Sequence, residues 1–453
     1  MHKPIRPPNW NEIVSKEDFT NWINNKDVVA IVRKCQLEYY YWEDLRYRYP
    51  SPPLSLDKIW ALIKVFRTQQ YNEIILGGTE FNYYVTEIAQ EKLHFIDSHA
   101  GQVIGSESPL GKFESRERER YLINSLMEEA IASSQMEGAM TTRKVAKEML
   151  RTKRKPKTNS ERMIYNNFQT MTYIKELFDD KTGKNRQLTP DIILTIHKKI
   201  TSGTLKNKDA EGKFRQTDDI TVDDPSTNEV IHVPPAANRI TEYMNDICHF
   251  ANVHSQPFIH PLVKAVMLHF LIGYVHPFED GNGRTARALF YWQCLRSGYW
   301  TFEYMPISRI IKRAYAQYGR AYLHTEYDDM DLNYFIHYNL GCIEKANEEL
   351  NQYLIRKQTE RTHALQMMNQ MSKLMNLRQS LIIKEFTDNP ERIITIRETQ
   401  TKFNVTYQTA RTDLIYLTKN GFLEQKKHGK QFVYQKSTHF EEKIEKLTDK
   451  EKK

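Results

Sequence analysis

The segment that decides the fold of this 453-residue chain is His276-Pro277-Phe278-Glu279-Asp280-Gly281-Asn282-Gly283-Arg284-Thr285-Ala286-Arg287. Apolar residues at helical spacing precede it and predict a helix that begins at His260-Pro261 and ends near Val275. A second apolar helix is predicted from about Arg284 to Leu295. The polar segment between the two is therefore a short loop that leads directly into a helix N-terminus. We expect a mainly helical domain with its chemistry at this helix start.

Several residues of this loop are of types that bind phosphate. The first N–H groups of a helix are unpaired and favour an anion. Gly281 and Gly283 have no Cβ, so the backbone can approach a phosphate closely. Asn282 tolerates unusual backbone angles and offers an amide donor. Arg284 and Arg287 are three residues apart, hence neighbours on the helix surface, and their forked donors suit phosphate oxygens.

Two further residues of the loop suit metal binding and proton transfer. Asp280 supplies a hard oxygen of the kind that Mg²⁺ prefers. His276 is the side chain here that can accept a proton near neutral pH. The segment 276–287 thus combines a base, a metal carboxylate, an anion site and two arginines, which together predict a catalytic phosphate site.

The same segment resembles the signature of the Fic family: His, any residue, Phe, any residue, Asp or Glu, then Gly-Asn-Gly-Arg, two residues and Arg. Every position matches. The resemblance extends more loosely over about 115–345, where Gly212-Lys213-Phe214-Arg215 and Val233-Pro234-Pro235 resemble the flanks of the family's flap. It implies a protein adenylyltransferase, which moves AMP from ATP to a Ser, Thr or Tyr hydroxyl of a target protein or of itself and releases pyrophosphate.

The resemblance implies a role for each residue of the segment. His276 would take the proton from the hydroxyl that attacks the α-phosphate, and Asp280 would hold Mg²⁺ or Mn²⁺. Phe278 would anchor the loop in the core. The ATP-binding residues would be Gly281, Asn282 and Gly283 at the α and β phosphates, Arg284 and Arg287 at the β/γ end, and Tyr322 as a candidate for packing on adenine. A plain core role for Tyr322 is an equal alternative.

A second match precedes the first in the chain. A helix predicted from about Glu117 to Glu137 stops at Gly138. Its end, Ser133-Ser134-Gln135-Met136-Glu137-Gly138, resembles the family's inhibitory motif, which is Ser or Thr, three residues, Glu, then Gly or Asn. The resemblance implies that Glu137 pairs with Arg287 and holds ATP in an unproductive geometry. The alternative is an ordinary helix end.

One segment interrupts the helical pattern. The stretches Ile220-Thr221-Val222 and Glu229-Val230-Ile231-His232-Val233 are β-prone, and turn-forming residues lie between them. They predict a β-hairpin that projects from a helical body. By the resemblance, this hairpin would be a flap that aligns the target segment by strand-like pairing, with Ile220, Thr221 and Val222 as its docking residues. An ordinary surface loop is the alternative.

Composition and helix-breaking residues divide the chain into five parts. A helical region rich in Trp and Tyr covers 1–110, the Fic domain with its inhibitory helix covers 115–345, and a helical linker covers 346–376. Residues 377–437 form a unit of helices followed by a basic-tipped hairpin, which resembles a winged helix-turn-helix, and a charged tail covers 438–453. In that unit Thr406 to Leu417 would be a recognition helix for DNA, although such units also serve as protein-interaction modules.

Net charge, cysteine spacing and the length of apolar runs limit the possible class of protein. The net charge of +8 permits contact with nucleic acid or phosphate and requires neither. The basic stretch at 151–157 is interpreted as a solvated loop, with a nucleic-acid contact as the alternative. Four cysteines lack zinc or redox spacing and are expected to be buried, reduced thiols: Cys35, Cys248, Cys294 and Cys342. The chain shows neither a signal-type segment nor a membrane-spanning apolar run, which predicts a cytoplasmic protein without membrane contact.

Two other functions stay open from the sequence. The site could also remove AMP, with Glu137 positioning water, or the chain could be a DNA-binding regulator with a sensing Fic domain. The intact Gly281-Asn282-Gly283-Arg284 with Arg287 argues against a phosphate-transferring relative. A homodimer is expected only by analogy with the same class.

Overall fold

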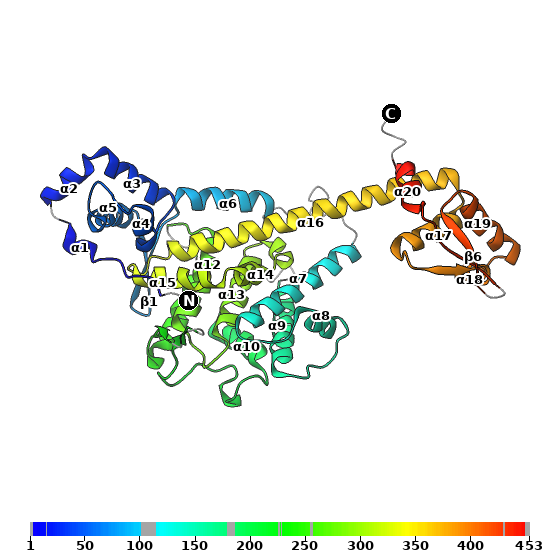
Figure 1. Cartoon of the computed structure of the whole chain (residues 1–453). Helices are drawn as coiled ribbons and strands as arrows, with labels where there is room; N and C mark the ends of the chain where they lie inside the picture. Colours follow the sequence, from blue (N-terminus) through cyan, green and yellow to red (C-terminus); the bar gives the residue numbers. More distant parts are fainter. Residues whose placement is uncertain are drawn as a thin grey trace. The chain divides into compact units, whose positions relative to one another are not determined.

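The computed structural model describes residues 3–14, 16–100, 115–178, 186–224, 227, 229–253, 257–428 and 431–448. The chain is mostly helical, as the sequence predicted, and its strands are short (Figure 1). It divides into two compact units, Met1–Asn351 and Gln352–Lys453, and the helix α16 (Asn333–Leu374) begins in the first and ends in the second.

The first unit begins with helices around an aromatic core that includes Tyr41, Trp42 and Trp60. A hairpin of two five-residue strands follows these helices and was not predicted from the sequence. Its turn, Gly77-Gly78, has positive φ at both residues, which glycine adopts without a Cβ clash. The elements are α1 (Trp10–Ile13), α2 (Lys16–Ile23), α3 (Lys26–Leu37), α4 (Trp42–Arg48), α5 (Leu56–Thr68), β1 (Asn72–Leu76), β2 (Thr79–Tyr83) and α6 (Glu87–Ala100).

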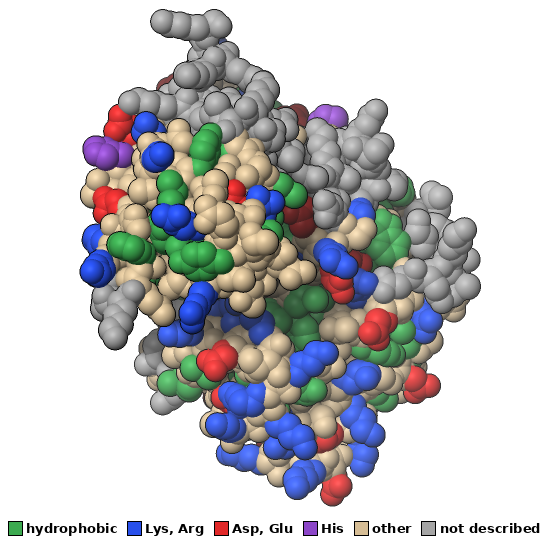
Figure 2. Space-filling model, turned by 90° about the vertical axis from the view of Figure 1, so that its right-hand side faces the viewer, with side chains coloured by type: hydrophobic (Ala, Val, Ile, Leu, Met, Phe, Trp, Pro, Cys, Tyr) green, Lys and Arg blue, Asp and Glu red, His purple; other side chains and the backbone are tan. Residues whose placement is uncertain are grey.

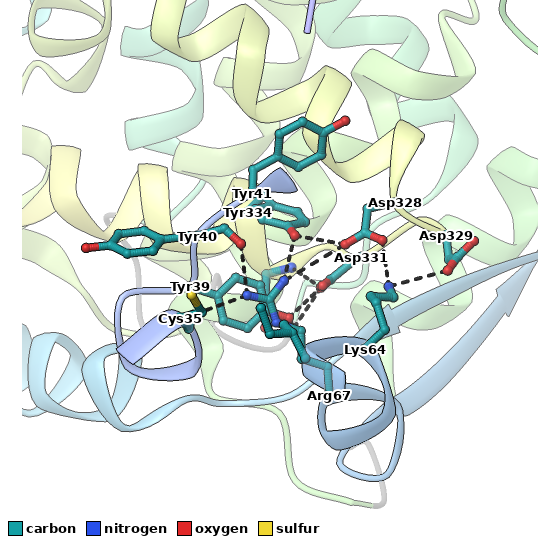
Figure 3. A network of polar contacts seen from close by, with 12 residues as sticks. Cys35, Tyr39, Tyr40, Tyr41, Lys64, Arg67, Asp328, Asp329, Asp331 and Tyr334 are labelled. Atoms are coloured by element: carbon teal, nitrogen blue, oxygen red, sulfur yellow. Dashed lines mark hydrogen bonds and ion pairs between the residues drawn. The ribbon is translucent and has the colours of Figure 1, made fainter. Parts of the chain in front are cut away.

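A buried polar network fixes this region to the start of α16 (Figure 3). Arg67 on α5 donates to the Tyr334 hydroxyl at 2.6 Å and to the backbone carbonyls of Cys35 and Tyr40. Tyr334 in turn donates to Asp328 at 2.8 Å, and Lys64 lies 2.7 Å from the same carboxylate. Charged groups and hydroxyls from segments 267 residues apart thus pair with one another in the interior.

The rest of the first unit is a helical body built around α12 (Pro261–Val275) and α13 (Asn282–Arg296), which are buried over most of their length. The Pro-initiated helix start predicted at His260 is present, and α10 starts in the same way after Thr189; both side chains accept a backbone N–H of the first turn. The surrounding helices are α7 (Ser115–Met136), α8 (Arg143–Arg151), α9 (Asn159–Glu176), α10 (Pro190–Thr201), α11 (Ile240–Asn252), α14 (Ile307–Arg313) and α15 (Tyr315–Tyr327), with short 3-10 turns at Lys208–Ala210, Ala237–Arg239 and Trp300–Tyr304.

The predicted flap is an antiparallel pair, β3 (Val222–Asp223) and β4 (Val230–His232), and it is shorter than the sequence suggested. Ile220 and Thr221 lie before the strand rather than in it, which corrects the predicted strand boundaries. The register shifts between Val222 and Asp223, and the Thr221 hydroxyl donates to the Asp223 carboxylate, so the ladder is interrupted there. Turn residues 225, 226 and 228 lie outside the described residues.

The second unit has its own apolar core, which includes Ile383, Phe386, Leu414 and Tyr434. Its order is helix, strand, two helices and hairpin, and the strand β5 was not predicted because it is only three residues long. The sheet is antiparallel in the order β5-β7-β6. The elements are α17 (Leu377–Asp388), β5 (Ile393–Thr395), α18 (Ile396–Phe403), α19 (Tyr407–Lys419), β6 (Leu423–His428), β7 (Gln431–Lys436) and α20 (Phe440–Thr448). The tip residues 429–430 and the end of the charged tail lie outside the described residues.

Two expectations from composition can be compared with the structure. The four cysteines are free and buried, as predicted. Among the ranges that the structure describes, no helix combines the length and the apolar character that crossing a bilayer requires.

Candidate active site

The 276–287 segment forms the predicted loop between α12 and α13. His276 is the C-cap of α12 in the left-handed region (φ 48°), and Gly281 is the N-cap of α13 at φ 85°. A Cβ at position 281 would lie 2.8 Å from the Thr201 side chain, so only glycine fits there without displacing a neighbour. The backbone therefore turns sharply and aims the first N–H groups of α13 outward.

Internal contacts hold the loop in place. Phe278 is fully buried, as predicted, and stacks on the His197 ring at 3.7 Å between centroids. The Asn282 side chain accepts the Phe278 N–H at 2.9 Å and donates to the Phe278 carbonyl at 2.8 Å. The amide of Asn282 was expected to offer a donor to phosphate. The amide is buried and one of its two N–H donors is used within the loop, so phosphate binding by this side chain stays a prediction.

Two residues that sequence reasoning did not single out brace the loop from outside. His197 on α10 accepts the Gly212 N–H and lies 2.9 Å from the Asp280 carbonyl, and burial lowers its pKa to about 4. The Arg215 guanidinium donates to the His276 carbonyl at 2.9 Å. A single His in an apolar helix carries no pattern that would mark it. For Arg215, the only signal was its position in the predicted flank of the flap.

The geometry of His276 suits a general base. Its Nδ1 lies 3.0 Å from the Gly273 carbonyl oxygen, and a carbonyl can only accept. Nδ1 therefore carries the hydrogen, which leaves Nε2 of the neutral ring free to take a proton. Burial lowers the pKa of His276, and the nearby His232 and Arg215 lower it further, so the ring is neutral at neutral pH.

Arg284 has buried hydrogen-bond donors that an anion could accept from. Its side chain is 1% exposed, and its Nε and Nη1 are buried without a hydrogen-bond partner among the described residues. The remaining nitrogen, Nη2, lies 3.5 Å from the Asp280 carboxylate. Buried donors are nearly always paired, so two open donors on one guanidinium indicate that a ligand supplies the acceptors.

The ion pair predicted between Glu137 and Arg287 is present. Arg287 Nη2 donates to Glu137 Oε1 at 2.9 Å, and Arg287 also donates to the hydroxyl and the carbonyl of Ser133. Burial by itself lowers the pKa of Arg287, but Glu137, Tyr318 and Glu129 together raise it above its ordinary value. Gly138, at φ 88°, follows the end of α7, as predicted.

The Glu137 carboxylate lies directly against the first turn of α13. A Cβ at position 283 would come within 2.3 Å of Glu137 Oε1, so the absence of a side chain on Gly283 makes this approach possible. The start of a helix favours an anion, and here the protein's own carboxylate is the anion.

Two cavities meet at this point and share Glu137, His276, Gly283 and Asp223. One, of about 380 Å³, is lined by Val222 of the flap and by aromatic residues including Tyr318 and Tyr322. The other, of about 300 Å³, is lined by Ile220, Thr221, Asp280 and the backbone of 281–283. The structure thus brings the predicted site residues from the flap, from the 276–287 segment and from α7 to one place.

Tyr322 has the expected core contacts, and its packing on adenine stays a prediction. It lines the larger cavity, and its ring also stacks on Phe270 at 5.1 Å while its hydroxyl donates to the His269 carbonyl.

Asp280 is the carboxylate of the 276–287 segment best placed for a metal ion. Its side chain is 58% exposed and faces the smaller cavity. No group of three or more His, Cys, Asp or Glu residues able to hold a metal ion occurs in the described part of the chain. Mg²⁺ characteristically binds through one or two carboxylates, substrate phosphates and water, so this donor set fits that ion.

Comparison with known proteins agrees with this geometry. Residues 187–294 match the Fic/DOC family. "Protein adenylyltransferase Fic" of Nematostella vectensis is 33% identical over 116 residues, which are 26% of this chain and 25% of that relative. The protein of the same name from Aedes aegypti is 27% identical over 164 residues, 36% and 29% of the two lengths. The match therefore spans less than a third of either relative.

A solved structure extends the likeness in fold. The crystal structure of a Fic family protein from Desulfovibrio desulfuricans G20 aligns with a TM-score of 0.55 at 18% identity, over 79% of this chain and 98% of that one. The helical body thus shares the fold of that protein. This chain contains a Fic domain, whose family match covers residues 187–294.

Proposed function

We propose that this chain is a protein adenylyltransferase that transfers AMP from ATP to a Ser, Thr or Tyr hydroxyl of a target protein or of itself, and that Glu137 inhibits it. One observation carries the proposal. The proton-accepting Nε2 of His276, the open donors of Arg284 and the N-terminus of α13 lie in a single 276–287 segment. A base beside an anion site is what nucleotidyl transfer to a hydroxyl requires.

In the proposed reaction, the target oxygen forms a bond to the α-phosphorus of ATP. The bond from that phosphorus to the bridging oxygen breaks, pyrophosphate leaves, and the hydroxyl proton passes to Nε2 of His276. The open donors of Arg284 and the backbone N–H groups of 281–283 would bind the phosphates. Asp280 would hold Mg²⁺ or Mn²⁺, which neutralises phosphate charge. Tyr322 would lie beside the adenine in the larger cavity.

Inhibition would follow from the position of Glu137. Its carboxylate lies over Gly283 and binds Arg287, so it occupies both the space and the arginine that the terminal phosphates of ATP need. Two anions repel at such a distance, and ATP would bind with its phosphates displaced. Because in-line attack requires close alignment, a modest displacement is enough to suppress the reaction.

The target would dock on the flap. Ile220, Thr221 and Val222 line the cavities that contain His276, so a segment lying along them would bring a hydroxyl to the base. Short strands such as β3 recognise extended segments through backbone pairing.

The test is labelling of the chain with α-labelled ATP and Mg²⁺, followed by mass spectrometry for added AMP. We expect low labelling in the wild type, strong labelling in Glu137→Gly and none in Glu137→Gly/His276→Ala. Arg287→Ala should not reproduce the activation, because it removes a phosphate contact together with the ion pair. Equal labelling in wild type and Glu137→Gly would refute inhibition, and labelling in the double variant would refute the site.

Hydrolytic removal of AMP would use the same residues. Glu137 would then position the water that removes AMP from a modified protein. Incubating AMP-labelled protein with wild type and with Glu137→Gly separates the two activities: loss of label that depends on Glu137 supports removal, and unchanged label supports transfer alone.

A second candidate function concerns the C-terminal unit, which we propose contacts DNA as a winged helix-turn-helix. The helix α19 packs against the hairpin strand β6, and Leu414 and Leu417 of α19 share an apolar core with Tyr434 of β7. Tyr407, Gln408 and Arg411 are exposed on α19. Salt-sensitive gel shifts by residues 352–453 would support this function. No shift at low salt would favour a protein-interaction module.

A further inference from the structure

The positive charge of the chain is concentrated in one place. Residues 143–162 hold nine Lys or Arg and two acidic residues, a net +7, whereas the whole chain has a net +8. They comprise α8, the connecting segment and the start of α9. Figure 2 views the side on which α8 lies in Figure 1 and shows Lys and Arg side chains gathered there. We call the basic side chains of 143–162 the basic face; all are exposed except the half-buried Lys147 and Arg154. They are Arg143, Lys144, Lys147, Arg151, Lys153, Arg154, Lys155, Lys157 and Arg162.

Most of the basic face has no internal counter-charge. Arg143 and Lys147 share Glu128 of α7, and Arg154 pairs with Glu161 at 2.8 Å. The other six side chains are exposed and have no carboxylate partner within the described ranges: Lys144, Arg151, Lys153, Lys155, Lys157 and Arg162. A groove of about 440 Å³ runs along α8 between Arg143 and Thr152. The groove also holds the carboxylate of Glu148, but six cations outside any ion pair leave a net positive surface that favours a polyanion.

One lysine of the basic face is held in a strained conformation. Lys153 has φ 53° at the end of α8, where its N–H bonds to the Leu150 carbonyl and the Arg154 N–H bonds to the Met149 carbonyl. This pattern is a Schellman motif, whose left-handed position normally holds glycine because other residues are disfavoured there. A lysine at a position that favours glycine allows a substitution that removes the charge without straining the backbone.

The connecting segment is held rigidly. The Glu161 carboxylate binds Arg154 through both oxygens and accepts the Lys157 N–H at 2.6 Å. Pro156 restricts Lys155 to extended backbone. In an extended chain, residues two apart lie on the same side, and Lys155 and Lys157 would be spaced by about 6.6 Å. This is about twice the axial rise per nucleotide along one strand of a duplex, which is about 3.4 Å.

We propose that the basic face binds the phosphate backbone of a nucleic acid without reading its sequence. A membrane fits less well, because α8 buries its apolar residues Ala146, Met149 and Leu150 in a cluster with α7 and α9 and leaves only Val145 exposed, which is too little apolar surface to insert. An acidic protein fits less well, because residues 143–162 contain no aromatic side chain to anchor an interface. The site is separate from the AMP-transfer residues and does not depend on that proposal.

The experiment uses the full chain with labelled duplex DNA and single-stranded RNA, and measures affinity from about 50 to about 200 mM salt. We expect binding that weakens with salt. Lys155→Gln/Lys157→Gln should reduce the slope of log affinity against log salt by about 1.4 to about 1.8, since each phosphate contact contributes about 0.7–0.9. The matched control is Lys26→Gln/Lys34→Gln, two exposed lysines of α3, which should leave the slope unchanged. Comparing the two probes shows which nucleic acid is preferred.

Lys153→Gly separates binding from folding. Glycine relieves the left-handed strain, so the unfolding midpoint should stay or rise while nucleic-acid affinity falls. Lys426→Gln/Lys427→Gln reports the share due to the C-terminal unit. The proposal is overturned if the wild type does not bind at low salt, if only the Lys426/Lys427 variant loses affinity, or if Lys155→Gln/Lys157→Gln binds as the wild type does. Preferential binding to phosphatidylglycerol vesicles would overturn it as well.

Discussion

Two buried arginines of the same unit, Arg67 and Arg284, differ in what their guanidinium groups contact. Arg67 donates to the Tyr334 hydroxyl, the Gln36 side chain and two backbone carbonyls, so each of its nitrogens has a partner (Figure 3). Arg284 is equally buried, yet its Nε and Nη1 have no partner among the described residues. The chain thus supplies the acceptors where an arginine holds the fold together, and leaves donors open where a ligand is to bind.

The difference has an energetic meaning. A buried donor without an acceptor costs about 1–3 kcal/mol of stability, so the open donors of Arg284 are a burden on the folded protein without its ligand. The nitrogens of Arg67 all have partners, so this network carries no such cost. Removing one of its members would leave a buried polar group unpaired. Variants of the site should therefore change chemistry and spare stability, whereas variants of the network should do the reverse.

The largest expected effect is on chemistry. His276→Ala in the Glu137→Gly background should lower the rate of AMP transfer by about 10²–10⁴, because it removes the base that takes the hydroxyl proton. The urea midpoint should stay close to that of the parent. Rates from autolabelling and midpoints from circular dichroism test both halves, and a large drop in the midpoint would place His276 with the structural residues instead.

The next effect is on stability. Asp328→Asn should destabilise the protein by about 3–5 kcal/mol, because it leaves the fully buried Lys64 without its nearest counter-charge. Urea unfolding measures this loss. Asp280→Asn is the matched control, since that carboxylate is largely exposed and should change stability little. Similar losses in both variants would contradict the division between the two regions.

A third effect depends on pH. The pKa of His197 is about 4 in the folded protein because of burial, and an unfolded His has a pKa of about 6.5. The unfolded chain therefore binds the proton first, and stability is lost as pH falls from about 6.5 towards 4, by up to about 3 kcal/mol. Unfolding midpoints of wild type and His197→Gln across this range should show a shallower pH slope in the variant. Parallel slopes would show that His197 contributes nothing to it.

The smallest expected effect concerns Arg284 itself. Arg284→Met removes two unpaired donors, so the free energy of unfolding should stay the same or rise. ATP affinity should fall by roughly tenfold to a hundredfold, which corresponds to about 1.5–3 kcal/mol for hydrogen bonds to a charged group. Calorimetry in the Glu137→Gly background would measure this affinity. Unchanged ATP affinity would mean that the open donors serve some other ligand.

The sequence predicted those parts of the fold and site that depend on residues close together in the chain. The helices on either side of 276–287 follow from regular apolar spacing, and the start of the first follows from His260-Pro261. The pairing of Glu137 with Arg287 was predicted across 150 residues only because both belong to recognisable motifs. Without those motifs, neither charge would have indicated the other.

What the sequence did not predict depends on contacts between distant or unremarkable residues. His197 matters through its stacking on Phe278, and a solitary His in a helix gives no hint of that. The Arg67 network joins α5 to α16, and nothing local marks its members as partners. The strand β5 is too short to show an alternation of apolar and polar residues. The Asn282 side chain bonds to the Phe278 backbone, a contact that no sequence pattern marks.

The missing side chain at Gly283 has a consequence for how such a protein can evolve. A methyl group there would collide with the Glu137 carboxylate, and it would also fill the space against which a phosphate would lie. Natural variation at position 283 therefore cannot exchange an inhibited enzyme for an active one, since both states need the same gap. Variation at position 137 can, because a Glu codon becomes a Gly codon by a single base change. Under the proposed mechanism, one nucleotide substitution in codon 137 would abolish inhibition, whereas catalysis depends on several residues. Selection would therefore have to maintain inhibition and catalysis separately.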